Sequence, residues 1–278
     1  MTKRVGLIGY PLGHSISPVF QQAAFDHLKI DARYDLWITA SNSLKRVVDD
    51  LRAVDALGCN VTVPYKETVM SMLDELDDMC RQIGACNTIV NNAGKLTGYN
   101  TDAQGFIKAL REDGSFDPAG KRVSILGTGG AARAAGFVLI NAGVSSITLV
   151  YEIEEQANLL ASSLRDAGGN IFIFKPQDVA AAMSGCELLV NCTPFGMKGS
   201  LLEGKSLVET KDIPAGILVY DIVYNPLKTQ LLINAENACA RTLAGLSMLV
   251  YQGAAAFELW TGKDAPTNVM LKVAQSAL

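Results

Sequence analysis

A short apolar strand that runs into a glycine-rich loop and then into a helix of small residues is the feature that most constrains this chain. Residues 123–126 are Val-Ser-Ile-Leu, and residues 127–132 are Gly-Thr-Gly-Gly-Ala-Ala. A buried strand followed by Gly-x-Gly-x-x-Ala at the start of a helix is typical of a dinucleotide site. Gly127 allows the tight turn, Gly129 lets backbone N–H groups approach a pyrophosphate, and Ala132 lets the helix pack close to its strand. We therefore predict a dinucleotide-binding loop, with a chance glycine-rich turn as the alternative.

The segment after the next predicted strand bears on which dinucleotide fits. Residues 150–155 are Val-Tyr-Glu-Ile-Glu-Glu, without a lysine or an arginine. An acidic side chain at this place can hydrogen-bond the ribose hydroxyls of NAD, whereas an arginine favours the 2′-phosphate of NADP. Because three carboxylates would repel that phosphate, we predict NAD, with Glu152 as the ribose ligand. The alternative is that these glutamates only stabilise the N-terminus of the following helix.

Strands alternate with helices along the chain, which predicts an α/β protein with mostly parallel sheets. In the first part we predict strands at 5–8, 34–39 and 58–63, a hairpin at 87–99, and helices at 18–28, 44–56 and 68–79. A polar stretch at 112–118 precedes the second part, in which we predict strands at 123–126, 147–150, 171–174, 187–191 and 218–222, a helix at 154–167, and a helical tail from residue 230 that breaks at 242–246.

The composition and net charge indicate which kinds of molecule this protein binds. Hydrophobic residues make up 49% of the 278 residues, enough for a sizeable core, and the net charge is −4. Since duplex nucleic-acid binders normally carry a basic excess, we expect a small-molecule substrate and no nucleic acid. The absence of a long apolar run or a signal-like N-terminus leads us to expect a cytoplasmic protein without a membrane partner. Six cysteines without a C-x-x-C pair and only two histidines predict a reduced, metal-free protein.

Polar residues in the first part occupy positions where a core would need apolar ones. Residues 60–66 are Asn-Val-Thr-Val-Pro-Tyr-Lys, so Asn60 and Thr62 share one face of a strand and Lys66 lies near its carboxyl end. Asp102 follows the hairpin and can reach the same rim, where open α/β sheets hold ligands. A lysine beside an aspartate in a cleft is suited to proton transfer. On spacing alone, a surface lysine and a helix-capping aspartate remain the simpler interpretation.

Eight short blocks of sequence, in a fixed order, carry a family resemblance. They are Gly-Tyr-Pro-Leu-Gly-His-Ser-Ile-Ser-Pro at 9–18, Asn-Val-Thr-Val-Pro-Tyr-Lys at 60–66, Gly-Ala-Cys-Asn-Thr at 84–88, Gly-Tyr-Asn-Thr-Asp at 98–102, the glycine loop, Asn-Cys-Thr-Pro-Phe-Gly-Met at 191–197, Asp-Ile-Val-Tyr-Asn-Pro at 221–226, and Gly-Leu-Ser-Met-Leu-Val-Tyr-Gln at 245–252. Together they resemble shikimate dehydrogenase, in the shikimate and quinate dehydrogenase family, over nearly the whole chain. Eight ordered blocks are far more specific than any one of them.

The resemblance implies an α/β fold of two domains: an N-terminal substrate domain with a mostly parallel sheet, and a Rossmann-like dinucleotide-binding domain. Residues 1–104, completed by C-terminal helices within 246–278, would form the substrate-binding catalytic domain, and residues 105–245 the other. The implied enzyme is an NAD(P)-dependent oxidoreductase that reversibly reduces 3-dehydroshikimate to shikimate in aromatic amino acid (chorismate) biosynthesis. NAD is favoured, NADP is the alternative, and a homodimer is compatible with the family.

The same resemblance implies roles for individual side chains. Ser15 and Ser17 would hold the substrate carboxylate, while Asn87, Asp102 and the nearby Thr62 would hold ring hydroxyls. Tyr224 and Gln252 would close the substrate site, with Lys66 and Asp102 as the catalytic pair. The expected cofactor contacts are Gly127, Gly129, Gly130, Ala131, Glu152, Thr193, Ile222 and Gly245. We expect a structural hydrogen-bonding role for His14.

Three alternative functions stay open at this point. A quinate dehydrogenase that uses NAD has a similar site, although Ser17 stands where quinate-using members carry threonine, which favours shikimate. A ligand-sensing binder without turnover would not need both Lys66 and Asp102. A methylene-folate dehydrogenase fits the paired serines less well. The chain also departs from many members of the family at Ser247, where they carry glycine, and at 151–153, where NADP-using members carry Asn-Arg-Thr.

Overall fold

The chain folds into two compact α/β units. The computed structural model describes residues 1–13 and 15–278, so His14 lies outside the described residues. One unit comprises residues 1–105 with 250–277, and the other comprises residues 106–249 with Leu278. The boundaries fall inside two helices, α4 (Thr101–Glu112) and α9 (Leu246–Thr261). Within the described ranges, no helix combines the length and the apolar character needed to cross a bilayer.

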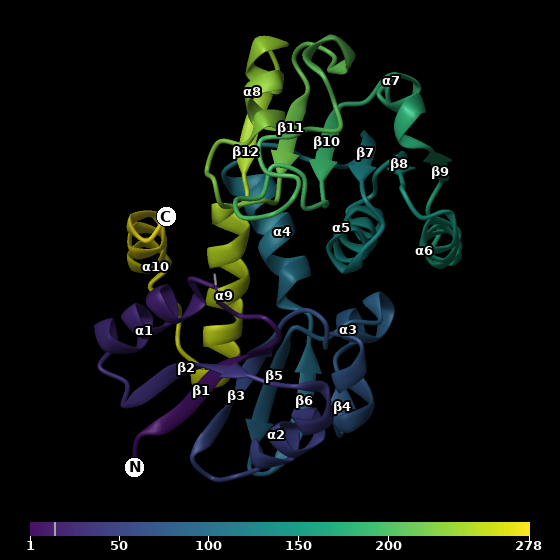
Figure 1. The fold of residues 1–278 in the computed structure, drawn as a ribbon. Coiled ribbons are helices and arrows are strands. Elements are labelled where there is room, and N and C mark those ends of the chain that lie inside the picture. The colour runs from purple at the N-terminus through teal and green to yellow at the C-terminus, as the bar shows by residue number, and fades with distance from the viewer. Residues whose placement is uncertain (14) are drawn as a thin grey trace. The chain divides into compact units, whose positions relative to one another are not determined.

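The sheet of the first unit has six strands in the order β2-β1-β3-β5-β6-β4 (Figure 1). β5 runs antiparallel to both of its neighbours, and the remaining pairs are parallel. The carboxyl ends of β1, β3 and β6 therefore meet the amino end of β5 at one edge. The strands are β1 (Lys3–Gly9), β2 (Ala32–Ile38), β3 (Ala56–Val61), β4 (Glu75–Leu76), β5 (Thr88–Asn92) and β6 (Lys95–Tyr99).

Helices cover both faces of this sheet. On one face, the indole Nε1 of Trp260 in α9 donates a hydrogen bond to the Ile89 carbonyl oxygen at 3.0 Å. On the other face, Leu44 and Val48 of α2 join a buried cluster with residues of β3 and β5. The helices of this unit are α1 (Ser17–His27), α2 (Leu44–Asp50), α3 (Asp78–Ile83) and α10 (Thr267–Ser276), with 3-10 turns η1 (Ser41–Ser43) and η2 (Thr68–Met72).

The sheet of the second unit is entirely parallel, in the order β12-β11-β10-β7-β8-β9. The chain builds outward from β7 through β8 to β9 and then returns to the other side of β7, so the order reverses between β7 and β10. Its strands are β7 (Arg122–Leu126), β8 (Ser146–Val150), β9 (Ile171–Phe174), β10 (Leu188–Asn191), β11 (Leu218–Asp221) and β12 (Arg241–Ala244). Its helices are α5 (Gly130–Asn141), α6 (Glu154–Asp166), α7 (Val179–Ala182) and α8 (Gln230–Asn237), with η3 (Pro176–Asp178) and η4 (Thr210–Asp212).

These two sheets confirm the predicted fold class, but two predicted helices of the first unit were wrong in extent. The helix predicted at 44–56 ends at Asp50, because the Asn91 side chain binds the carbonyl oxygens of Ala53 and Ala56 and draws that segment to the sheet. The helix predicted at 68–79 is split into η2, β4 and α3. The Asp74 carboxylate accepts the backbone N–H of Leu96 at 2.7 Å, which pulls this segment alongside β6.

The break predicted at 242–246 overlaps a strand, Arg241–Ala244, that the sequence did not reveal. β12 has four residues and pairs with β11 at the edge of the second sheet. Its sequence, Arg-Thr-Leu-Ala, has two exposed residues and no marked strand preference, so tertiary pairing rather than local propensity decides its conformation.

The packing of Trp260 gives a stability prediction. Trp260→Phe keeps an aromatic ring in the core but leaves the Ile89 carbonyl oxygen without this donor, so we expect a loss of about 1–3 kcal/mol in the free energy of unfolding. Urea unfolding followed by circular dichroism measures it. The control is Leu201→Ala, at a side chain that is 95% exposed, which should change the stability by less than about 0.5 kcal/mol. Equal stability of Trp260→Phe and the unmodified chain would contradict the assigned role.

Candidate active site

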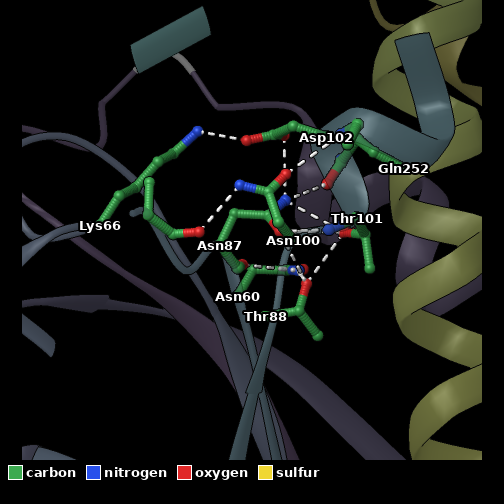
Figure 2. Close-up of polar contacts among 10 residues, drawn as sticks. Asn60, Lys66, Asn87, Thr88, Asn100, Thr101, Asp102 and Gln252 are labelled. Carbon is green, nitrogen blue, oxygen red and sulfur yellow. Dashed lines mark hydrogen bonds and ion pairs between the residues drawn. The ribbon is translucent and has the colours of Figure 1, made fainter. Parts of the chain in front are cut away.

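The edge of the first sheet brings a lysine and an aspartate together. Lys66 follows β3 after a short turn, and Asp102 is the second residue of α4, directly after β6. The Lys66 Nζ atom donates to Asp102 Oδ2 at 2.6 Å (Figure 2). Their side chains are 27% and 18% exposed, so the pair is accessible from one side and sheltered from the other. An ammonium group and a carboxylate held in this way can give or take a proton at a bound hydroxyl or carbonyl oxygen.

The backbone fixes both members of this pair. The Cys86 N–H donates to the Lys66 carbonyl oxygen at 2.7 Å, which ties the lysine to the segment just before β5. Asn100 caps α4, because its Oδ1 atom accepts the N–H of Ala103 at 3.1 Å. The Nδ2 atom of Asn100 donates to the Ala85 carbonyl oxygen at 2.9 Å. Residues 85–86 therefore hold the backbone of Lys66 and the start of α4, from which the two side chains of the ion pair extend.

Asn87 is the hub of the site. Its side chain is buried, and its Oδ1 atom accepts the backbone N–H of Thr101 at 2.6 Å. With the oxygen fixed, the Nδ2 atom faces Asp102 Oδ1 at 2.9 Å and Gln252 Oε1, on α9, at 3.2 Å. Asp102 therefore accepts from Lys66 on one oxygen and from Asn87 on the other (Figure 2). Four of the predicted substrate and catalytic residues lie in one hydrogen-bonded group, namely Lys66, Asn87, Asp102 and Gln252.

A chain of buried polar groups lies beneath this hub. Thr101 Oγ1 and Thr88 Oγ1 are 2.9 Å apart, and Thr88 Oγ1 accepts from Asn60 Nδ2 at 3.0 Å. Asn60 Oδ1 in turn accepts from the Tyr34 hydroxyl at 2.8 Å. Burial raises the pKa of the Tyr34 phenol well above its usual value. One continuous network thus joins Tyr34 to Asn87 under the edge of the sheet.

The two predicted serines and Thr62 lie along the same edge. Ser15 Oγ accepts the backbone N–H of Ser17 at 3.3 Å, and Ser17 is the buried first residue of α1. A Cβ atom on Gly9, the last residue of β1, would lie 2.4 Å from Thr62 Cγ2, so Thr62 lies directly against the end of β1. This edge therefore presents hydroxyl, amide, ammonium and carboxylate groups, which suit a small polyhydroxylated acid.

In the second unit, predicted cofactor residues follow the carboxyl ends of five parallel strands. They are Gly127 after β7, Glu152 after β8, Thr193 after β10, Ile222 after β11 and Gly245 after β12. Because the strands are parallel, these positions share one edge, and ligands of open α/β sheets bind there at the point where the strand order reverses. Glu152 is exposed at this edge.

The glycine loop has the backbone that its sequence requires. Gly127 has a φ of 97°, and a Cβ atom there would lie 2.9 Å from Thr193 Cγ2. Gly129 and Gly130 have open space where a Cβ atom would be, and no side chain caps the N-terminus of α5. Ala131 is half-buried in the first turn of that helix. Free backbone N–H groups at an accessible helix N-terminus suit a pyrophosphate.

Gly245 and Tyr224 follow the last two strands of the second unit. At Gly245, a Cβ atom would clash with the Ile222 carbonyl oxygen, so the segments that follow β11 and β12 approach this closely only because this residue is glycine. Tyr224 is half-buried two residues beyond Ile222, and burial raises the pKa of its phenol.

Sequence reasoning missed the supporting residues of both edges. In the first unit these are Tyr34, Thr88, Asn100 and Thr101, and in the second Asn191, Asp221 and Thr229. They could have been found, since each is a polar residue within or next to an apolar strand or at a helix start, where burial demands a hydrogen-bond partner. Asn60 was recognised as out of place in a core, but its partners are distant in sequence.

Comparisons with known proteins show which family the chain resembles. Residues 7–89 match the family model of the shikimate dehydrogenase substrate binding domain, and residues 245–275 match that of the shikimate 5'-dehydrogenase C-terminal domain. The chain is 41% identical to the shikimate dehydrogenase (NADP(+)) of Methanopyrus kandleri, over 97% of this chain and 93% of that protein.

Two solved structures have a closely similar fold. The shikimate 5-dehydrogenase of Listeria monocytogenes, in complex with shikimate and NAD, has a TM-score of 0.91 and 34% identity, covering 98% of this chain and 96% of that one. The quinate dehydrogenase of Corynebacterium glutamicum, in complex with NAD, has a TM-score of 0.91 and 28% identity, covering 99% of each chain. With identity above 40% over nearly its full length to one relative, the chain belongs to the shikimate dehydrogenase family.

Proposed function

We propose that this protein is an NAD(P)-dependent shikimate dehydrogenase that reversibly reduces 3-dehydroshikimate to shikimate, with NAD preferred to NADP. The observation that carries the proposal is the hydrogen-bonded group of Lys66, Asp102, Asn87 and Gln252 at one edge of the first sheet. A binder that only senses a ligand does not need an ammonium–carboxylate pair for proton transfer, so this group favours an enzyme.

Substrate recognition follows from the chemistry of that edge. Ser15 and Ser17 lie beyond β1 and would receive the substrate carboxylate, while Asn87 and Asp102 would receive ring hydroxyls. Each ring hydroxyl can both donate and accept a hydrogen bond. A site can therefore recognise the position of a hydroxyl only if the protein group that binds it has a fixed orientation. The buried network beneath Asn87 supplies that orientation, because it leaves the amide only one satisfied arrangement.

The proton step is assigned to Lys66. Hydride transfer to the ketone carbon is the chemistry that the nicotinamide supplies when bound. As the ketone becomes an alcohol, its oxygen must gain a proton, and the Lys66 ammonium would donate it. In the oxidation of shikimate, the neutral Lys66 amine would take the proton from the same hydroxyl. Asp102, 2.6 Å from Lys66 Nζ, orients the lysine for this transfer.

The residues of the second unit fit a dinucleotide. The positive φ of Gly127, the open space at Gly129 and Gly130, and the accessible N-terminus of α5 together form a pyrophosphate cradle. Ala131 in the first turn, and Thr193, Ile222 and Gly245 at the neighbouring strand ends, would complete the contacts along the edge.

The preference for NAD rests on the segment after β8. Glu152 is exposed there, two residues before the acidic first turn of α6, which carries Glu154 and Glu155. A 2′-phosphate at this place would meet negative charge, whereas a ribose diol would find an acceptor. Relatives occur with both cofactors: the Methanopyrus kandleri protein is named for NADP(+), and the Listeria monocytogenes structure holds NAD.

A quinate dehydrogenase is the second candidate, supported by the structural similarity to the Corynebacterium glutamicum enzyme. Initial velocities with shikimate or quinate, each paired with NAD or NADP, test the proposal. We expect the highest kcat/KM with shikimate and NAD. Turnover of quinate alone would overturn the substrate assignment, and turnover only with NADP would overturn the cofactor preference.

The role of Lys66 predicts a specific kinetic defect. Lys66→Ala removes the proton donor but none of the predicted carboxylate ligands, so kcat should fall by about 100-fold or more while the Kd for shikimate changes little. Steady-state rates and shikimate titration measure the two effects. The matched control is Lys45→Ala, which removes an exposed lysine of α2 paired with Asp49 and should leave kcat unchanged. Nearly full turnover in Lys66→Ala would refute the assigned role.

The position of Glu152 predicts a change of cofactor preference. Glu152→Arg replaces a ribose acceptor by a phosphate-binding group, so the kcat/KM ratio of NADP to NAD should rise by about tenfold or more. The control Glu112→Arg makes the same charge change at an exposed residue of α4 and should leave the ratio as it is. If both variants behave alike, Glu152 does not contact the ribose.

A further inference from the structure

A buried carboxylate lies between the ends of β10 and β11 in the second unit. Asp221, the last residue of β11, has no exposed surface. Its Oδ1 atom accepts from Asn191 Nδ2 at 2.8 Å and from the Val223 N–H at 3.0 Å, and its Oδ2 atom accepts from Thr229 Oγ1 at 2.6 Å. All three donors are neutral, so no ion pair among the described residues explains why a carboxylate is kept here.

Asp221 determines the orientation of the Asn191 amide. These two residues are paired directly across β10 and β11. Since Asn191 Nδ2 donates to the carboxylate, its Oδ1 atom must point the other way, towards Thr193. There it accepts the Thr193 N–H at 3.0 Å and the Thr193 Oγ1 hydroxyl at 2.6 Å. Flipping the amide would set two donors against Thr193 and an acceptor against the carboxylate.

The other two donors attach neighbouring segments to the same carboxylate. The Val223 N–H belongs to the residue after Ile222, so its bond fixes the turn that leaves β11. The Thr229 hydroxyl also accepts the N–H of Leu232 at 3.4 Å and so caps α8. A Cβ atom on Gly196 would lie 3.1 Å from Thr229 Cβ, which places the loop containing Thr193 directly against this cap.

Burying the carboxylate has a cost that its hydrogen bonds only partly offset. Burial raises the pKa of Asp221, while the bonds from Thr229, Val223 and Asn191 act in the opposite direction. An apolar residue at the end of β11 would avoid this cost. What an apolar residue could not do is hold the two segments that follow β10 and β11 in one arrangement.

We propose that Asp221 is a positioning residue for dinucleotide binding, which fixes Thr193 through Asn191 and the Ile222 turn through the Val223 N–H. The inference rests on the proposed function, because Thr193 and Ile222 are predicted cofactor contacts. Asp221 itself has no exposed surface, so it would act through its neighbours and not by direct contact with substrate or cofactor. Its loss should therefore weaken dinucleotide binding while leaving the proton step at Lys66 intact.

Dinucleotide titration of the substrate-free enzyme tests this inference. Asp221→Asn keeps the size of the side chain but turns one acceptor into a donor, so the Kd for the preferred dinucleotide, NAD or NADP, should rise by about tenfold or more. At saturating dinucleotide and shikimate, kcat should stay within about threefold of the unmodified enzyme. Calorimetric titration gives Kd, and initial rates give kcat and the separate KM values.

The matched control is Ser124→Ala in β7 of the same sheet. Ser124 is equally buried and donates one hydrogen bond to the Ala182 carbonyl oxygen at 2.7 Å, but it lies in the middle of its strand. Its loss should leave the Kd for dinucleotide unchanged. An unaltered Kd in Asp221→Asn, or an equal rise in Ser124→Ala, would overturn the inference. Failure of the unmodified enzyme to bind either dinucleotide would instead overturn the proposed function.

A milder pair of variants keeps the test valid if Asp221→Asn does not fold. Thr229→Val removes the hydroxyl donor and keeps the branched shape, whereas Thr229→Ser keeps the donor. We expect Kd to rise by about threefold to tenfold in Thr229→Val and to return towards the original value in Thr229→Ser. Equal Kd values in the two variants would contradict the role of the carboxylate network.

Discussion

The buried amide of Asn87 can satisfy its hydrogen bonds in only one orientation, and the arrangement of the first unit's edge follows from this. Its oxygen is committed to the Thr101 N–H at 2.6 Å, so its nitrogen must face Asp102 and Gln252. Asp102 is then left with one oxygen for Lys66. An unsatisfied buried amide would cost about 1–3 kcal/mol, so the amide resists rotation and holds the Lys66–Asp102 pair in place.

The same physical logic operates in the second unit. There a buried carboxylate, Asp221, orients an asparagine, Asn191, which in turn holds the Thr193 turn. In both units a buried asparagine amide at a strand end can satisfy its hydrogen bonds in one orientation only. That orientation fixes the neighbouring residue, which is Asp102 for Asn87 and Thr193 for Asn191. The rigid part is in each case the sheet, and most groups assigned to ligands lie just beyond the carboxyl ends of its strands. Asn87 lies at the same edge, just before the amino end of the antiparallel strand β5. The proposed substrate site and the proposed cofactor site thus each have a buried hydrogen-bond network within their own unit.

Much of this could be predicted from the sequence because the informative signals were local. The glycine loop at 127–132 and the hairpin at 87–99 have strong short-range patterns, and eight ordered blocks pointed to the family. Prediction failed where tertiary partners decide the conformation. Asn91 ends α2 early from a position some 40 residues away, and β12 becomes a strand only through pairing with β11. The networks under Asn87 and Asp221 join residues far apart in sequence, so no spacing rule reveals them.

We expect Lys66 Nζ and the Asp102 carboxylate to contact the same oxygen of the substrate ring. A crystal structure of the enzyme with bound shikimate tests it most directly. We predict one ring hydroxyl within hydrogen-bond distance of both Lys66 Nζ and the Asp102 carboxylate. Asn87 should contact the ring, and Ser15 and Ser17 should contact the carboxylate of shikimate. Shikimate bound with neither Lys66 nor Asp102 in contact with its ring hydroxyls would contradict it.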